Sequence, residues 1–160
     1  MTTADNTDLD AIANAVRYAL CSPNATRHNG VVVFLILETT YDSVYLLISQ
    51  DGWAVDVEYG SQRRDATGLA DDYNRGLIIG RDWDEADGDI LAALLADVRR
   101  EVENLETNYP EMADEEDEET KASLLKELAK VKDRLVGIDE AFGFTLLSAY
   151  EESAAWEAKP

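Results

Sequence analysis

The chain has few of the residues on which most catalytic sites depend. Its 160 residues include one histidine, His28, and one cysteine, Cys21. A lone histidine cannot build a metal site of several imidazoles, and a lone cysteine excludes an internal disulfide. A phosphate-binding loop of the glycine-lysine type is also missing, and Gly76 to Gly80 lacks the spacing of a dinucleotide-binding motif. We therefore expect no enzyme activity, no cofactor and no metal ion.

Long apolar segments are missing as well. The longest, Val31 to Leu37, has seven residues, whereas a helix that spans a bilayer needs about 20. The first residues, Met1 to Asn6, show neither the basic start nor the apolar stretch of an export signal. Cys21 follows an apolar helical pattern and is interpreted as a small buried hydrophobic residue rather than a nucleophile. These features predict a cytoplasmic protein without a membrane span.

Basic residues are scarce, and this determines which partners the chain can attract. There are 34 acidic residues against 14 basic ones, which gives a net charge of −20, and no lysine precedes Lys121. Such a field repels nucleic acids and anionic lipids and attracts basic surfaces. We therefore expect a basic protein surface as the partner and no direct contact with nucleic acid. Adaptation to molar salt, or solubility alone, would also account for the acidity.

Two apolar series in the second half of the chain predict a pair of helices. Their residues follow one another at steps of four and three, which is the 3.5-residue period that keeps one stripe of a helix against a partner. We expect an antiparallel hairpin, with Glu101 and Arg134 flanking the seam as an exposed pair that contributes about 0.2–1 kcal/mol. The first series is Leu91, Leu95, Val98, Val102, Leu105 and Tyr109, and the second is Leu124, Leu128, Val131, Leu135, Ile138 and Phe142.

The first half of the chain predicts a helix followed by strands. Apolar residues from Leu9 to Leu20 recur at helical spacing after Asn6 or Thr7, either of which can cap the helix. Val31 to Leu37 is β-branched and apolar at odd and even positions, so we expect a central strand that is covered on both faces. Asp51-Gly52 predicts a hairpin turn. Trp53 to Tyr59 then alternates, which indicates one buried face and one wet face, the latter with Ala54, Asp56 and Glu58.

The connecting segments are expected to be less regular. Asn24 to Gly30 is predicted to be a polar loop, and Gly60 to Asn74 a loop with one short helix. Leu77 to Ile79 is long enough only for a short fourth strand, and Thr145 to Trp156 is expected to form the last helix.

These elements predict the α+β class: an N-terminal helix on a three- to four-stranded antiparallel meander, followed by an antiparallel helical hairpin and a C-terminal helix. We expect a sheet unit over residues 1–83 and a helical arm over residues 84–160, with one compact domain as the alternative.

A run of six acidic residues lies between the two apolar series. Neither series continues through it, because projecting the second series backward places Lys121 and Asp117 at core positions. We therefore expect this run at the solvated tip of the hairpin, where it is the first candidate for partner binding. Its members are Asp114, Glu115, Glu116, Asp117, Glu118 and Glu119.

A second acidic cluster precedes the hairpin. It consists of Asp82, Asp84, Asp87 and Asp89, close to Gly88. A calcium loop of the EF-hand type fails, because Gly88 at its sixth position places Trp83 and Leu94 at the first and last ligand positions. We expect these acids to cap helices, and they are the second candidate for partner binding.

In size, charge and lack of catalytic residues, the chain resembles the acidic DNA-mimic inhibitors that phages and plasmids direct against restriction or CRISPR machinery. The resemblance implies a non-enzymatic anti-restriction or anti-CRISPR protein. In such a protein, carboxylates on a rigid helix take the place of phosphates in a basic nucleic-acid channel, and salt weakens the complex.

Two alternatives stay open. The order of elements also resembles the acidic secretion-type chaperones, in which a sheet holds an extended client or a second copy of the protein, so a homodimer is one expectation. Val31 to Leu37 would suit that role. The third hypothesis is a cytoplasmic domain from a halophile, whose acidity serves only hydration.

Overall fold

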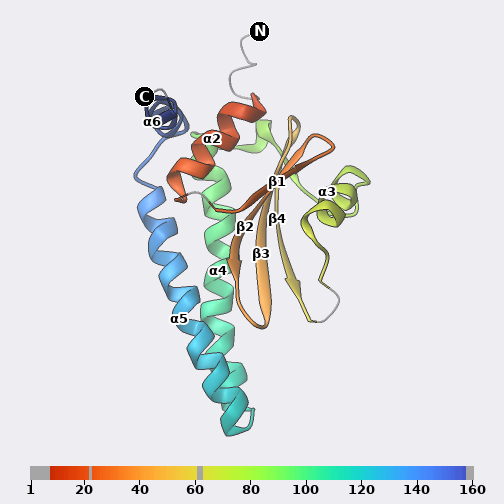
Figure 1. Cartoon of the computed structure of the whole chain (residues 1–160), viewed down its shortest axis with the longest axis vertical. Helices are drawn as coiled ribbons and strands as arrows, with labels where there is room; N and C mark the ends of the chain where they lie inside the picture. The colour runs from red at the N-terminus through yellow and green to blue at the C-terminus, as the bar shows by residue number, and fades with distance from the viewer. Residues whose placement is uncertain (1–7, 22, 61–62, 158–160) are drawn as a thin grey trace.

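The computed structural model describes residues 8–21, 23–60 and 63–157 and confirms the α+β class (Figure 1). The strands form one antiparallel sheet in the order β1-β2-β3-β4-β5. The elements are α2 (Leu9–Ala19), β1 (Ala25–His28), β2 (Val31–Glu38), β3 (Asp42–Ile48), β4 (Gly52–Tyr59), α3 (Ala66–Asn74), β5 (Arg81–Asp82), the 3-10 helix η1 (Trp83–Glu85), α4 (Ile90–Asp114), α5 (Glu118–Ala141) and α6 (Leu146–Glu157).

Helices cover the sheet on both faces. On one face, Phe34 and Leu46 belong to a large core that α2, α4, α5 and α6 complete. On the other face, Val33 and Leu47 form a smaller core with Leu69 of α3. This arrangement confirms that the strand predicted at Val31 to Leu37 is buried from both sides.

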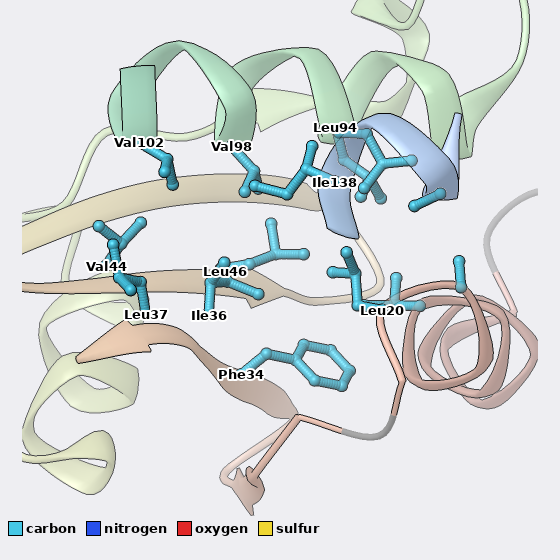
Figure 2. Packing of buried hydrophobic residues seen from close by; sticks show 14 of the residues in the cluster. Leu20, Phe34, Ile36, Leu37, Val44, Leu46, Leu94, Val98, Val102 and Ile138 are labelled. Atoms are coloured by element: carbon cyan, nitrogen blue, oxygen red, sulfur yellow. The ribbon is translucent and has the colours of Figure 1, made fainter. Parts of the chain in front are cut away.

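The main core joins the sheet to the hairpin. Figure 2 shows Ile36 and Leu46 of the sheet pointing toward Val98 and Val102 of α4, with Ile138 of α5 beside them. All five side chains are buried, with exposed fractions of 4% or less. Burial of a side chain of this size contributes roughly 1.5–3 kcal/mol, so this contact fixes the near half of the hairpin on the sheet.

The predicted seam between the two helices is confirmed for all but one of its residues. The exception is Phe142, which is 38% exposed and forms the C-cap of α5. Because α5 ends at Ala141, the Phe142 side chain leaves the helical stripe. Phe144 packs against the core in its place and meets Tyr18 edge to face, with 5.4 Å between ring centroids.

The segment predicted to be a polar loop contains a strand. β1 pairs with β2 from Ala25 opposite Phe34 to His28 opposite Val31. Asn29 and Gly30 form the turn, with φ values of 49° and 81°. An Asn-Gly pair is the preferred sequence for a two-residue turn with positive φ at both positions, so the turn carried a signal although the strand has no apolar pattern.

The predicted fourth strand at Leu77 to Ile79 is wrong. Pairing occurs two residues later, where Arg81 and Asp82 lie opposite Trp53 and Gly52. A Cβ on Gly52 would collide with the Arg81 carbonyl. The side chain missing at Gly52 therefore allows β5 to approach at this point.

The ends of α2 also differ from the prediction. Asp8 caps the helix by accepting a hydrogen bond from the Asp10 amide at 3.1 Å, whereas Asn6 and Thr7 lie outside the described residues. Cys21 is exposed and has a φ of 60°. The expected buried position is wrong because the chain turns away immediately after the last residues of α2.

Candidate functional site

The acidic run lies at the far tip of the hairpin, beyond the end of the sheet (Figure 1). Asp114 is the last residue of α4, Asp117 is the N-cap of α5, and Glu118 and Glu119 occupy its first turn. All six side chains from Asp114 to Glu119 are exposed. The structure therefore confirms the solvated position that the interrupted seam predicted.

The tip is exposed to solvent because the apolar seam between α4 and α5 ends before it. Ala113 is the last buried residue of α4, and Leu124 is the first buried residue of α5. Between them the chain reverses direction, and the one apolar side chain among residues 114–123 is the small and exposed Ala122. Glu118 and Glu119 are stabilised there because the N-terminus of α5 carries a partial positive charge from its helix dipole. Asp114 and Glu115 lie at the C-terminus of α4, where the dipole disfavours a negative charge.

Within the described part of the chain, the run has no ionic partner. No Lys or Arg nitrogen lies within 4.0 Å of a carboxylate oxygen of these six residues. Asp117 alone has a structural contact, because its Oδ1 accepts a hydrogen bond from the Thr120 amide at 2.8 Å. That bond lowers the pKa of Asp117. The other five carboxylates point to solvent without a recorded partner.

Two sets of polar contacts, buried in part, hold the base of the projecting arm. The Tyr109 hydroxyl of α4 donates to Asp42 Oδ2 at 2.6 Å and meets Thr39 Oγ1 at 2.6 Å. Glu127 of α5 accepts hydrogen bonds from the amide and the hydroxyl of Thr40, both at 2.6 Å. Both helices are therefore tied to the turn between β2 and β3, and the segment beyond these contacts projects as one arm.

The same contacts shift the pKa values of Tyr109 and Glu127. Burial and the Asp42 carboxylate raise the pKa of Tyr109. Burial of Glu127 acts to raise its pKa, but hydrogen bonds from Thr40 and Lys130 outweigh that effect, and the net pKa lies below the usual value. Glu127 is 3% exposed, so this carboxylate is ionised inside the fold and is a structural group rather than part of the acidic surface.

The second acidic cluster divides into structural and free carboxylates. Asp82 Oδ1 accepts from the Asp84 amide at 3.0 Å and caps η1. Asp89 caps α4 through the amides of Leu91 and Ala92, and its Oδ2 also accepts from the Leu146 amide at 3.0 Å. The helix-cap interpretation is thus confirmed for these two residues. Asp84 and Asp87 are exposed.

The two clusters are far apart. They lie at opposite ends of α4, which has 25 residues and is therefore roughly 36 Å long at about 1.5 Å per residue. The structure does not combine the ten predicted site residues into one patch. It leaves the tip as the dense group and Asp84 and Asp87 as a distant pair.

The expected pair between Glu101 and Arg134 is wrong. Arg134 Nε donates to the carbonyl oxygen of Ile36 at 2.6 Å, and its NH1 donates to that of Leu20 at 3.4 Å. Across the hairpin, Arg99 instead donates to Asp139 at 2.7 Å. Arg134 therefore joins α5 to the sheet, a long-range role that sequence spacing cannot reveal.

One charged cluster was missed by sequence reasoning. Asp56 and Glu58, which were predicted on a wet face of β4, lie close to Arg64 and Asp72. The nearest contacts are Arg64 NH2 to Glu58 at 2.8 Å and Arg64 NH1 to Asp72 at 2.8 Å. The predicted wet face is wrong because Arg64 folds back over it; Glu58 is 7% exposed.

The carboxylates of this cluster differ in protonation. Burial, together with the neighbouring Glu58, raises the pKa of Asp56 to about 7. Hydrogen bonds from Arg64 lower the pKa of Glu58 to about 2. Asp56 Oδ2 is buried without a hydrogen-bond partner in the described part of the chain. The alternating acids of β4 were the only sequence signal for this cluster.

A second missed network surrounds Asp97 of α4. Its Oδ2 accepts hydrogen bonds from Trp53 Nε1 at 2.9 Å and from Arg81 at 3.1 Å, and its Oδ1 forms an ion pair with Arg100 at 3.2 Å. The Arg81 guanidinium lies 4.9 Å from the centre of the Trp53 ring, and Trp53 stacks on Trp83. Asp97 therefore holds α4 to β4 and β5.

Over residues 8–21, 23–60 and 63–157, no three His, Cys, Asp or Glu side chains form a group that could hold a metal ion. No helix in the described part of the chain is long and apolar enough to cross a membrane. Comparison with protein-family models, with curated proteins and with solved structures gives no match.

Proposed function

We propose that the chain is a non-enzymatic interaction module that inhibits a nucleic-acid-binding protein by DNA mimicry. The carboxylates of the hairpin tip would occupy a basic surface that otherwise binds phosphates. The observation that supports this proposal is the exposure of Asp114 to Glu119 without a described ionic partner. Other acids of the fold, such as Asp89 and Glu127, are already bound within the chain.

The anchoring of the arm also supports the proposal. Tyr109 and Glu127 fix both helices at the edge of the sheet, so little conformational freedom is lost when the tip enters a cleft. Preorganisation of this kind increases affinity because ordering costs are already met in the free protein. Complementary charge accelerates association and makes it sensitive to salt.

The flank of α5 limits how a basic partner can approach. Lys126 and Lys132 are exposed on this helix, and like charges on the partner would be repelled there. On α4, by contrast, Glu103 and Glu111 are exposed. We therefore expect the partner to contact the tip end-on and to extend along the α4 side.

The experiment compares two variants that have the same net charge. The tip variant carries Asp114→Asn, Glu115→Gln, Glu116→Gln, Glu118→Gln and Glu119→Gln and keeps the Asp117 cap. The control variant neutralises five exposed acids elsewhere: Glu38, Asp133, Glu140, Glu151 and Glu152. Each set removes five negative charges and changes the net charge from −20 to −15. Any difference between the variants therefore reports position rather than total charge.

Each protein is immobilised and exposed to host lysate, and captured proteins are identified by mass spectrometry. The proposal expects nucleic-acid-binding proteins on the wild type and on the control, lost from the tip variant and released by duplex DNA or by salt. Retention of the same proteins by the tip variant, with unchanged salt dependence, would contradict it.

The same series separates the alternatives. A secretion-type chaperone would keep its client in both variants, since apolar contacts hold it; the strand first considered for that role is covered by helices on both faces. A halophilic domain would capture no specific protein, and both variants would alter only the dependence of its stability on salt.

A further inference from the structure

The outer edge of β4 is unpaired along most of its length. β4 runs over Gly52–Tyr59, but β5 pairs only with Gly52 and Trp53. From Ala54 to Tyr59 the strand therefore has β3 on one side and, among the residues that the structure describes, no strand on the other. An open strand edge presents a row of backbone donors and acceptors that can pair with another chain.

The direction of the free backbone groups follows from the pairing with β3. The Gly52 carbonyl accepts a hydrogen bond from the Ser49 amide at 2.9 Å. Because backbone groups alternate in direction along an antiparallel strand, every second residue after Gly52 faces β3. Trp53, Val55, Val57 and Tyr59 therefore turn their amide and carbonyl groups outward. Among the described residues, the outward groups of Val55 and Val57 have no recorded hydrogen bond.

A groove adjoins the start of this free edge. A pocket of about 120 Å³ is lined by Trp53 and Val55 of β4, by Ile79 and Gly80 before β5, and by Arg100 of α4. Ile79 is 86% exposed, although an apolar side chain of its size is more stable when buried. The start of the free β4 edge therefore lies beside a groove, and Ile79 gives this groove an apolar wall.

Next to the free edge, the two faces of β4 carry different kinds of side chain. Val55 and Val57 pack toward the main core on the α4 side. Asp56 and Glu58 lie on the other side, where Arg64 is the basic residue recorded beside them and Asp72 adds a third carboxylate. This side therefore carries three acids against one guanidinium. A buried carboxylate oxygen, Asp56 Oδ2, still lacks a hydrogen-bond donor.

We propose that the outer edge of β4 binds an extended segment of a partner protein whose side chains alternate between apolar and basic residues. Such a segment would pair its backbone with Val55 and Val57, as in other cases where a peptide adds a strand to a sheet. Its apolar side chains would lie beside the two valines and Ile79. A Lys or Arg side chain would lie against the acidic side formed by Asp56, Glu58 and Asp72.

A second copy of the chain fits this edge less well. The free outward groups at Val55, Val57 and Tyr59 are centred on Val57. A two-fold pairing about Val57 would place Asp56 of one copy opposite Glu58 of the other. Like charges directly opposite one another destabilise a pair of strands, so charge favours a basic partner over self-association. This surface is separate from the hairpin tip and does not depend on the function proposed for it.

The test uses the full chain and a defined probe. The probe is a seven-residue peptide of sequence Thr-Lys-Val-Arg-Val-Lys-Thr with blocked ends. We expect saturable binding in calorimetry and slowed hydrogen exchange at the amides of Val55 and Val57. Two matched peptides serve as controls: one has Glu in place of Lys and Arg, and one carries N-methyl groups on alternate amides, which removes its ladder donors. Both should bind at least tenfold more weakly.

Two variants test the site from the side of the protein. Asp56→Asn should weaken binding of the basic peptide about tenfold while leaving the strand in place. Val57→Pro removes an outward amide that β3 does not use, and proline is tolerated at such edge positions; it should abolish binding. If Val57→Pro does not fold, Asp56→Asn and the N-methylated peptide still decide the result.

Several outcomes would overturn the proposal. These are absence of peptide binding at millimolar concentration, equal binding of the Glu peptide or the N-methylated peptide, and protection at Ala25 and Arg27 of β1 in place of Val55 and Val57. A dimer that already protects Val55 and Val57 before peptide is added would assign the edge to a second copy.

Discussion

The two acidic ends of α4 have similar compositions but different environments. At the N-terminal end, Asp82 and Asp89 accept backbone hydrogen bonds. Asp97 accepts hydrogen bonds from Trp53 and Arg81 and forms an ion pair with Arg100. At the C-terminal end, five of six carboxylates have no recorded partner in the described chain. A count of acids therefore does not identify a binding surface. The useful distinction is whether the fold already satisfies each carboxylate.

This comparison predicts different costs for removing a carboxylate at each end. A satisfied carboxylate leaves unpaired donors behind when it is removed, whereas a free one leaves only solvent. Stability should therefore fall at the N-terminal end of α4 and binding should fall at the tip.

The largest effect is expected for Asp97→Ala. This change leaves the buried Trp53 Nε1 without an acceptor and removes the shared partner of Arg81 and Arg100. Breaking such a buried contact costs about 2–4 kcal/mol, which urea denaturation can measure. Asp133→Ala, at an exposed position of α5, is the control and should stay within about 0.5 kcal/mol. Equal stability of Asp97→Ala and wild type would show that the network is not a structural tie.

A smaller loss is expected for Asp89→Ala. Asp89 caps α4 and also accepts from the Leu146 amide of α6, so its removal affects two helix starts. Loss of an N-cap costs about 0.5–2 kcal/mol, and we expect the upper part of that range in the free energy of unfolding. Asp87→Ala, two residues earlier and exposed, should change little. The contrast between the ends of α4 fails if both substitutions have the same effect.

The pair Asp56 and Glu58 predicts a pH dependence of stability. The folded pKa of Asp56 is raised from 3.8 to about 7, so its contribution is complete below pH ~4 and is lost as the pH rises toward 7. The folded pKa of Glu58 is lowered from 4.5 to about 2, so its contribution is present above pH ~4.5 and is lost as the pH falls. Between pH ~4.5 and pH ~7, Asp56 is the member of this pair that titrates, so its contribution to the free energy of unfolding should decrease as the pH rises.

Asp56→Asn should remove that decrease. One pKa unit corresponds to about 1.4 kcal/mol, so between pH 5 and 8 the variant should gain at least about that much relative to the wild type. Urea denaturation at a series of pH values measures the difference. Parallel curves for the two proteins would show that Asp56 does not titrate in the folded state in this range.

Local patterns account for the parts of the fold that sequence predicted correctly. The apolar steps of four and three located the hairpin seam, and the doubly apolar Val31 to Leu37 indicated a strand covered on both faces. The same patterns located the tip, because the acidic run interrupts them. These predictions succeeded because spacing along the chain determines which residues share a helix stripe or a strand face.

Long-range contacts account for most of what was missed. β1 has no apolar alternation and forms because the Asn29-Gly30 turn brings it against β2. Arg134 binds the Ile36 carbonyl, which is 98 residues away in sequence, and Arg64 folds over the face of β4 that was expected to be wet. No local period encodes these contacts. The free edge of β4 also depends on them, because it exists only where β5 pairs two residues rather than more.

The smallest effect on stability is expected at the tip itself, for the variant that neutralises Asp114, Glu115, Glu116, Glu118 and Glu119 and keeps Asp117. Exposed substitutions away from structural contacts usually stay within about 0.5 kcal/mol. Neutralising Glu118 and Glu119 loses a favourable interaction with the α5 dipole, but neutralising Asp114 and Glu115 removes an unfavourable one with the α4 dipole, and removing like charges from one turn relieves repulsion. The variant should therefore match the wild type or slightly exceed its stability in dilute buffer. This gain should disappear near 1 M salt, where the Debye length is about 3 Å. Urea denaturation at both salt concentrations measures it. A loss of more than about 1 kcal/mol in the free energy of unfolding would mean that these carboxylates stabilise the turn, as Asp89 stabilises the starts of two helices. The carboxylates at the two ends of α4 would then both be structural, and the comparison would fail.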